Sequence, residues 1–269
     1  MSVLERVFLA VLYVAVAGLV LKTSAGQEPR ELKIAAAADL ASAMGKLGPA
    51  FEKQTGVHVT VSLGSSGNFF AQIQNGAPFD VFLSADKSYP EKLEQAGKTE
   101  GAISPYARGR LVIWVPTSSS LRFASQGDQV LDGNLDALTG PSVRKIAIAN
   151  PAHAPYGRAA VAALEHYGVY DRLQPKIVMG ENISQTAEFA QSGNADVALI
   201  ALSLAAAGNM QGQGRWVLLP ENSYPPIEQA GVVLKTSPNK VQAKQFLDFL
   251  TSPAGRSILL DFGFGAPAK

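Results

Sequence analysis

The stretch KIAAAADLASAM, from Lys33 to Met44, begins as a β-strand and ends as an α-helix. Its apolar start is typical of a buried strand, and the apolar spacing after Asp39 is typical of a helix. Small alanine side chains occupy the turn, where they let a ligand approach the free N–H groups at the start of the helix. The stretch therefore indicates an α/β protein with a binding site at this turn.

The same alternation of strands and helices continues along the chain. Three strand and helix units are expected in residues 32–95, and a second series in residues 145–201, after the apolar strand Leu111–Pro116. A last strand, Gln229–Leu234, is followed by two amphipathic helices. We predict an α/β fold with mostly parallel sheets flanked by helices. Two domains in tandem and two lobes joined by two crossover segments both fit this pattern.

The first 25 residues have the pattern of a signal peptide. Arg6 precedes an uninterrupted apolar run, Val7–Leu21, and small residues end the segment at Ala25. This run is shorter than a membrane-spanning helix requires, so cleavage after export is expected, with an uncleaved anchor as the alternative. The sequence therefore predicts a periplasmic location.

Composition excludes several classes of protein. The chain has 269 residues, 47% of them hydrophobic, with a formal net charge of +1 and no cysteine. A charge so close to zero does not favour binding to nucleic acid or to a membrane surface. Without cysteine there is no disulfide, no thiolate metal site and no lipid-anchored cysteine.

The turns that follow the predicted strands share an unusual composition. They are rich in Ala, Gly, Ser and Asn and poor in Lys and Arg, and in open parallel sheets such turns gather around the ligand. Helix N-termini there can bind an anion through main-chain N–H groups without a cationic side chain. The turns are AAADL (36–40), LGSSGN (63–68), SADK (84–87), NPAHAPYG (150–157), GENIS (180–184) and IALS (200–203).

The LGSSGN turn carries the most polar groups. The hydroxyls of Ser65 and Ser66 can donate hydrogen bonds, and Asn68 can cap the following helix. Ser and Asn are also ordinary helix caps, so a purely structural role is the alternative at any single turn. Several such turns together favour an anion site.

Signatures of catalysis or of a metal centre are absent from the sequence. There is no GxSxG nucleophile elbow and no GxxxxGK[ST] phosphate loop. His58, His153 and His166 are scattered, and no pair of carboxylates has a spacing that indicates acid and base catalysis. We therefore predict no catalytic residue, no metal held by side chains and no cofactor.

Six motifs together resemble the periplasmic molybdate-binding proteins of ABC importers, over essentially the whole chain after residue 25. This resemblance implies the type II periplasmic binding fold, with lobe I at residues 32–109 and 226–269 and lobe II at residues 110–225. It favours interleaved lobes over tandem domains. The motifs are AAADL, LGSSGN, NGAPFDVFLSAD, IANPAHAPYGRAA, GENISQTAEF and GRSILLDFGF.

The resemblance also implies a set of ligand contacts. Tyr156 and Ile183 would donate main-chain N–H groups, and Ser66 its hydroxyl and its N–H. Two positions depart from the family pattern, because Asp39 stands where a hydroxyl donor is common and Ala201 where a tyrosine is common. The implied ligand-binding residues are Asp39, Ser66, Tyr156, Ile183 and Ala201, supported by Ala38, Ser65, Asn68, Asn182 and Arg158.

Asp39 bears on the charge of the ligand. An ionised carboxylate only accepts hydrogen bonds, so it would repel fully deprotonated molybdate but suit a partly protonated oxyanion such as hydrogen phosphate. Alternatively, the carboxylate caps the helix and offers the ligand only its main chain. Arg158 is a candidate counter-charge across the cleft.

The function that these features imply is capture of a tetrahedral oxyanion, molybdate and also tungstate, and its delivery to an ABC permease. We expect a monomer that is not an enzyme. The alternatives are a binding protein for phosphate or sulfate, an extracytoplasmic sensing module, and an enzyme on the same scaffold that would use Asp39, His153 or Glu181.

Overall fold

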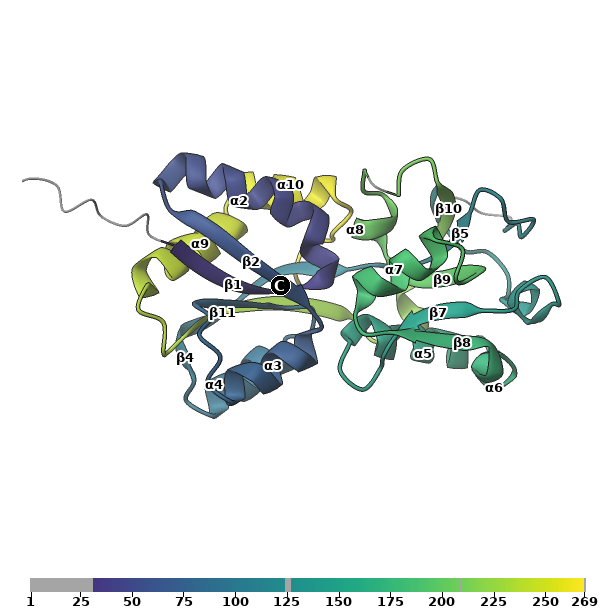
Figure 1. Cartoon of the computed structure of the whole chain (residues 1–269), viewed down its shortest axis with the longest axis horizontal. Helices are drawn as coiled ribbons and strands as arrows, with labels where there is room; N and C mark the ends of the chain where they lie inside the picture. The colour runs from purple at the N-terminus through teal and green to yellow at the C-terminus, as the bar shows by residue number, and fades with distance from the viewer. Residues whose placement is uncertain (1–30, 124–126, 209, 269) are drawn as a thin grey trace, which may run out of the picture. The chain divides into compact units, whose positions relative to one another are not determined.

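Two β-sheets with flanking helices make up the computed structural model of the protein (Figure 1). The structure describes residues 31–123, 127–208 and 210–268. The predicted signal peptide at residues 1–25 lies outside these ranges. Within them, no helix reaches the length and apolarity that crossing a bilayer requires.

The first sheet has the strand order β2, β1, β3, β11, β4. β1 pairs in parallel with β2 and β3, whereas β11 runs antiparallel to both β3 and β4. We call this sheet and its helices lobe I. Its elements are β1 (Glu31–Ala37), β2 (His58–Gly64), β3 (Val81–Ser84), β4 (Thr99–Gly109), β11 (Ile227–Leu234), η1 (Ala38–Leu40), α2 (Ala41–Thr55), α3 (Ser66–Gln74), α4 (Ser88–Gln95), α9 (Lys240–Thr251) and α10 (Pro253–Asp261).

Alternation along β1 builds a core on each face of this sheet. Leu32 and Ile34 point to the side covered by α2, α9 and α10, where Phe51 meets Phe246 edge-to-face. Ala35 points to the other side, against the apolar residues of α3 and α4. Figure 1 shows α2 and α10 on one side of the strands and α3 and α4 on the other. The sheet therefore holds the carboxyl end of β1 in a rigid frame.

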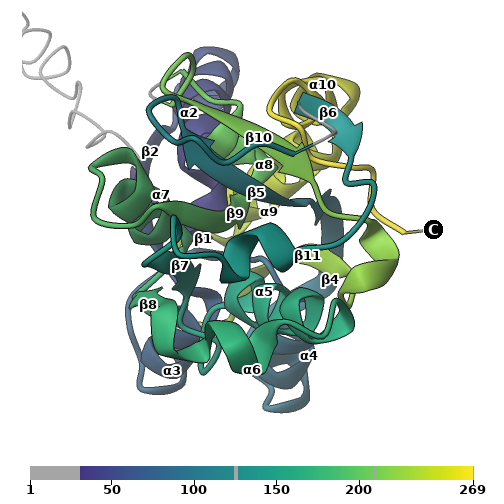
Figure 2. The same cartoon turned by 90° about the vertical axis from the view of Figure 1, so that its right-hand side faces the viewer.

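The second sheet has the strand order β6, β10, β5, β9, β7, β8, and with its helices it forms lobe II. β7 pairs in parallel with β8 and β9, and β5 runs antiparallel to β9 and β10. In Figure 2, α5 and α6 lie together beside β7 and β8. The elements are β5 (Leu111–Pro116), β6 (Gly127–Val130), β7 (Ile146–Ala149), β8 (Ile177–Gly180), β9 (Val197–Ala201), β10 (Gly214–Leu218), α5 (Pro155–His166), α6 (Tyr170–Leu173), α7 (Ile183–Gln191), α8 (Leu202–Ala205), η2 (Asp136–Thr139), η3 (Gln174–Lys176) and η4 (Glu221–Ser223).

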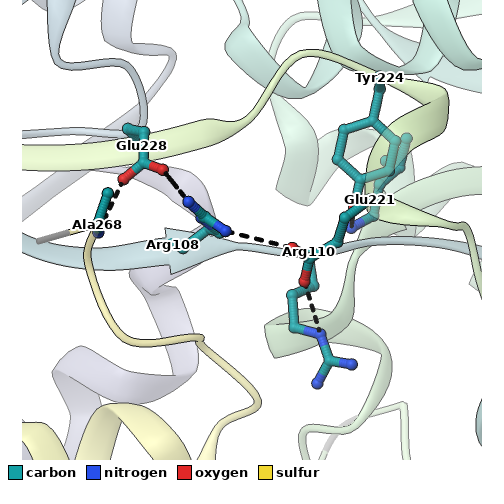
Figure 3. Close-up of polar contacts among 7 residues, drawn as sticks. Arg108, Arg110, Glu221, Tyr224, Glu228 and Ala268 are labelled. Carbon is teal, nitrogen blue, oxygen red and sulfur yellow. Dashed lines mark hydrogen bonds and ion pairs between the residues drawn. The ribbon is translucent and has the colours of Figure 1, made fainter.

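The chain passes between the sheets at two neighbouring segments that ion pairs join (Figure 3). Arg108, near the end of β4, donates to Oε1 of Glu228 in the neighbouring strand β11 from Nε at 2.9 Å and from Nη2 at 2.6 Å. The same guanidinium reaches Glu221 in the second segment at 3.4 Å, and the N–H of Leu111 donates to the Tyr224 hydroxyl at 3.2 Å. These contacts hold the two connections between the lobes side by side.

Most strands and helices expected from the sequence are present within a few residues of their predicted ends. Three strands were not predicted, namely β4, β6 and β10, and both sheets are mixed and not purely parallel. β4 contains Gly101, Pro105 and Gly109, which hide a strand from a propensity pattern. Sheet membership changes between Gly109 and Leu111 and again before Ile227. We keep the predicted ranges 32–109 with 226–269, and 110–225, as our proposal for the extent of the lobes.

Candidate ligand-binding site

A small pocket lies where turns of both lobes meet. It is a narrow cavity of about 10 Å³, and most of its wall consists of small side chains and main chain. Lobe I contributes the end of β1 and the turns after β2 and β3, and lobe II contributes the first residues of α5 and α7. The lining residues are Ala37, Ala38, Asp39, Gly64, Ser65, Ser66, Ala85, Ala154, Pro155, Tyr156 and Ile183.

Three helices begin at this pocket. α3 starts at Ser66, α5 at Pro155 and α7 at Ile183. Within the described part of the chain, the N–H groups of Ser66, Tyr156 and Ile183 have no hydrogen-bond partner. Free N–H groups and the positive end of the helix dipole both favour a negatively charged ligand. The pocket is therefore suited to a small anion.

Ser66 is a fully buried hydroxyl donor in the pocket wall. Its Oγ accepts a hydrogen bond from the N–H of Ala85 at 3.0 Å. Because this bond occupies a lone pair of the oxygen, the hydroxyl proton remains available to a ligand. Ser66 can thus offer the ligand both its hydroxyl and its N–H, as expected from the sequence.

Among the described residues, Asp39 is the one carboxyl group that lines the pocket, and it is completely buried. Its Oδ2 accepts a hydrogen bond from Nε2 of Gln229 in β11, whereas its Oδ1 has no partner among the described residues. Burial raises the pKa of this carboxyl to about 6, although the Gln229 and Tyr156 side chains and the nearby main-chain N–H groups oppose the rise.

Asp39 does not hold the N-cap position of η1 or of α2, which belong to Ala37 and Leu40. The main-chain N–H groups of Asp39 and Leu40 act on its carboxyl, but a side chain from elsewhere in the chain bonds to it as well. That side chain belongs to Gln229, a residue 190 positions later in the sequence. Asp39 therefore links the first turn of lobe I to the strand that follows the second crossover segment.

The Tyr156 side chain is buried, and its hydroxyl lies beside Gln229. Its hydroxyl is 3.5 Å from Nε2 of Gln229. Burial and then the charge of Asp39 raise the pKa of this hydroxyl well above its usual value, so it stays protonated. Tyr156 therefore contributes a neutral donor beside the Asp39 carboxyl.

No Lys, Arg or His lines the pocket among the residues that the structure describes. Arg158, expected as a counter-charge to Asp39, instead pairs with Asp86 of lobe I and donates to the Tyr89 hydroxyl at 3.3 Å. It therefore joins the two lobes outside the pocket and leaves the pocket itself without a cation. No group of three metal-binding side chains occurs within the described ranges either.

Hydrogen bonds between the lobes close the pocket. The N–H of Gly67 donates to the main-chain oxygen of His153 at 2.9 Å, and Nδ2 of Asn68 donates to Oε1 of Glu181 at 2.6 Å. On the other side of the pocket, the hydroxyls of Ser184 and Ser203 donate to the main-chain oxygens of Ala38 and Asp39 at 3.0 and 2.7 Å. The two lobes are therefore in direct contact around the pocket.

The structure brings together six of the ten residues singled out from the sequence, namely Ala38, Asp39, Ser65, Ser66, Tyr156 and Ile183. The other four lie outside the lining. Ala201 is buried at the end of β9, and Asn182 caps α7 by accepting from the N–H groups of Ser184 and Gln185. Asn68 sits inside α3 and does not cap it, because Ser65 holds the N-cap position.

Sequence reasoning missed two kinds of residue. The first is the small residues Ala37, Gly64, Ala85, Ala154 and Pro155, which lie in turns that the sequence had marked as candidate ligand loops. The second is Gln229, because nothing in the apolar strand pattern around it indicated contact with Asp39. Turn composition could have found the first kind but not the second.

Comparison with known proteins agrees with this geometry. The family described as bacterial extracellular solute-binding protein matches residues 32–265. The chain belongs to this family. This solute-binding protein is 38% identical to the molybdate-binding protein ModA of Rhodobacter capsulatus, over 93% of its own length and 92% of the relative's. It is 37% identical to the molybdate-binding protein ModA of Azotobacter vinelandii, over 87% and 90% of the two chains.

Solved structures confirm the predicted two-lobed fold. The periplasmic molybdate-binding protein of Azotobacter vinelandii matches this solute-binding protein with a TM-score of 0.79 and 36% identity, covering 88% of this chain and 100% of that chain. The sulfate-binding protein SubI of Mycobacterium tuberculosis matches with a TM-score of 0.72 at 16% identity, over 87% and 86% of the chains, which supports the fold alone. Because β11 lies in the same sheet as β1 to β4, the lobes are interleaved along the sequence and are not two domains in tandem.

Proposed function

We propose that this protein binds molybdate outside the cytoplasm and delivers it to an ABC permease. The observation that carries the proposal is the meeting of three helix N-termini and the Ser66 hydroxyl around one small pocket. Such a site holds a small oxyanion by neutral donors. The two relatives with 38% and 37% identity are both named molybdate-binding proteins.

Selection by size follows from the wall of the pocket. Alanine and glycine side chains leave the main chain accessible and cannot rearrange, so the donors stand at set distances from one another. Tungstate has the same tetrahedral shape and charge, and the proposal therefore includes it. Capture would proceed by hinge closure of the lobes, with the closed form recognised by the permease.

The proposal also covers the location and the oligomeric state of the protein. A signal peptide at residues 1–25 would direct export to the periplasm, where the protein would act as a monomer and would catalyse no reaction. Its cargo is the only ligand that the function needs, without a cofactor.

Sulfate or phosphate is the alternative cargo within the same class, because both are tetrahedral. An enzyme on this scaffold is not favoured, since His153 and Glu181 contact each other but neither contacts Asp39. Family membership and the absence of a cationic side chain from the described lining both support binding over catalysis.

Isothermal titration calorimetry of the purified protein with molybdate, tungstate, sulfate and phosphate tests the proposal. We expect saturable heat with molybdate and tungstate and much weaker or no heat with the other two anions. Heat with phosphate or sulfate alone would replace the molybdate assignment. Because the pocket lies between lobes, binding should also decrease the radius of gyration measured by small-angle scattering.

A further inference from the structure

The Asp39 carboxyl occupies an unusual position for a residue of an anion-binding pocket. It lines the pocket, it is 0% exposed, and its Oδ1 is without a partner in the described part of the protein. A buried carboxyl oxygen without a partner is energetically unfavourable, and more so when it is ionised. The atom is therefore available for a hydrogen bond with a molecule bound in the pocket.

The groups that face Asp39 do not neutralise its charge. β11 presents the neutral amide of Gln229, α5 the hydroxyl of Tyr156, and β4 the hydroxyl of Tyr106. From α8, Ser203 reaches only the main-chain oxygen of Asp39. No cation acts on the carboxyl from these elements or from the helices α3 and α7 at the pocket.

An ionised Asp39 would oppose binding of a doubly charged oxyanion. Both charges would lie in a buried space of low polarity, where like charges repel more strongly than in water. A neutral carboxyl removes this repulsion, and its O–H becomes a hydrogen-bond donor. The two protonation states of one side chain thus have opposite effects on the same ligand.

We propose that Asp39 takes up one proton from solvent when the oxyanion binds, and that its Oδ1–H then donates a hydrogen bond to an oxygen of the anion. No bond within the anion breaks, and the proton returns to solvent when the anion leaves. The inference rests on the proposed function and adds to it a residue that determines specificity. A neutral donor at this point favours a fully deprotonated oxyanion, which has no proton of its own to give.

The pKa of Asp39 supports this proposal. In the empty pocket it is already raised to about 6, mainly by burial. A dianion nearby raises the pKa of a carboxyl further, since it disfavours the ionised form. Near neutral pH, Asp39 is thus ionised in the empty protein and protonated in the complex.

Calorimetry of molybdate binding in buffers of different ionisation enthalpy measures this proton directly. At about pH 8 we expect uptake of close to one proton per molybdate, and an increase in Kd approaching tenfold per pH unit above about pH 6. In Asp39→Asn, the proton uptake should disappear and Kd should vary little with pH. Asp196→Asn alters a carboxylate of lobe II that binds the N–H groups of Arg144 and Lys145, and it should behave as wild type.

A second variant tests the role of Asp39 without replacing it. Gln229→Leu removes the hydrogen bond that stabilises the ionised carboxylate, so the pKa of Asp39 should rise. The pH at which affinity begins to fall should then move upward. If the pH at which affinity begins to fall is unchanged, the proposal is contradicted. A purely structural role of Gln229 would leave that pH unchanged.

Failure of this inference is distinct from failure of the proposed function. Tight molybdate binding without proton uptake, or full proton uptake by Asp39→Asn, overturns the role of Asp39 and leaves molybdate binding intact. No molybdate binding by folded wild-type protein between about pH 6 and about pH 8.5 overturns the proposed function itself.

Discussion

Oγ of Ser65, in the turn after β2, lies 2.9 Å from Nδ1 of His153, in the loop before α5. The two residues belong to different lobes, and the ring of His153 also approaches Oε1 of Glu181 at 3.5 Å. The main-chain oxygen of the same histidine accepts from the N–H of Gly67. His153 is therefore a point at which lobe II is held against the second turn of lobe I.

Gly67→Ala should prevent the lobes from closing. A Cβ at this position would lie 2.7 Å from the main-chain oxygen of His153 and 2.8 Å from its Cα, closer than these atoms can approach. Position 67 lies in α3, where alanine is the better helix former by about 1 kcal/mol, so lobe I should remain folded. We expect at least roughly tenfold weaker binding, measured by calorimetry, and no decrease in the radius of gyration with molybdate.

Gly45→Ala is the matched control for this variant. Gly45 also lies in a helix of lobe I, α2, and a Cβ there would have nothing within 4 Å. Gly45→Ala should bind molybdate with wild-type affinity and show the same decrease in radius of gyration. Wild-type affinity of Gly67→Ala would mean that contact at His153 is not needed for closure.

Ser66→Ala should weaken molybdate binding by roughly 10- to 100-fold, the usual effect of losing one hydrogen bond to a charged group. The hydroxyl already accepts from the N–H of Ala85, so the proton that it would give to the ligand has no replacement. Ser62→Ala, at an exposed position in β2, serves as the control and should leave Kd unchanged. Equal affinities of the two variants would show that the Ser66 hydroxyl does not contact the ligand.

Arg158→Gln should weaken binding only slightly, by up to about fivefold. The ion pair between Arg158 and Asp86 joins the two lobes but remains partly exposed, so water and salt screen it. The difference from wild type should shrink in high salt. Arg172→Gln removes an ion pair with Asp136 that lies within lobe II, and it should not affect Kd.

Asp39→Asn should stabilise the empty protein at high pH. Because the folded protein raises the pKa of Asp39 from 3.8 to about 6, the stability that its protonated form contributes is complete below pH 3.8 and lost as pH rises through about 6. The difference corresponds to roughly 3 kcal/mol of unfolding free energy. Urea unfolding of both proteins near pH 8 and near pH 4 should show a gain for the variant at the higher pH alone. An equal difference at both values would contradict the pKa shift.

The sequence predicted the parts of the fold that depend on local pattern. The strand and helix from Lys33 to Met44 lie close to where the apolar spacing placed them, because burial on one side of a helix or on both faces of a strand leaves a regular signal. β4 was missed, since it pairs with β11 at a sequence distance of more than 100 residues and has glycine and proline within it. Pairing of that kind leaves little trace in a local window.

The parts of the candidate site that depend on local sequence were predictable, and the contacts between distant segments were not. Ser66 was singled out as a hydroxyl donor in a turn of small residues, whereas Ile183 was implied by the resemblance to the molybdate-binding family. Both residues begin helices at the pocket. The partner of Asp39 was not predicted, because the contact with Gln229 depends on how η1 packs against a strand from the far end of the chain. Arg158 was misplaced for the same reason, since the position of Asp86 depends on closure of the lobes.

Alanine forms much of the pocket wall, at positions 37, 38, 85 and 154. Each presents a single methyl group, the smallest increment by which a protein can adjust a cavity. Replacing one with glycine enlarges the space by one methyl group, and replacing one with valine fills it, without removing any of the donors that hold the anion. The dimensions of the cargo and the strength with which it is held are thus encoded at separate positions, so selection could change one while keeping the other.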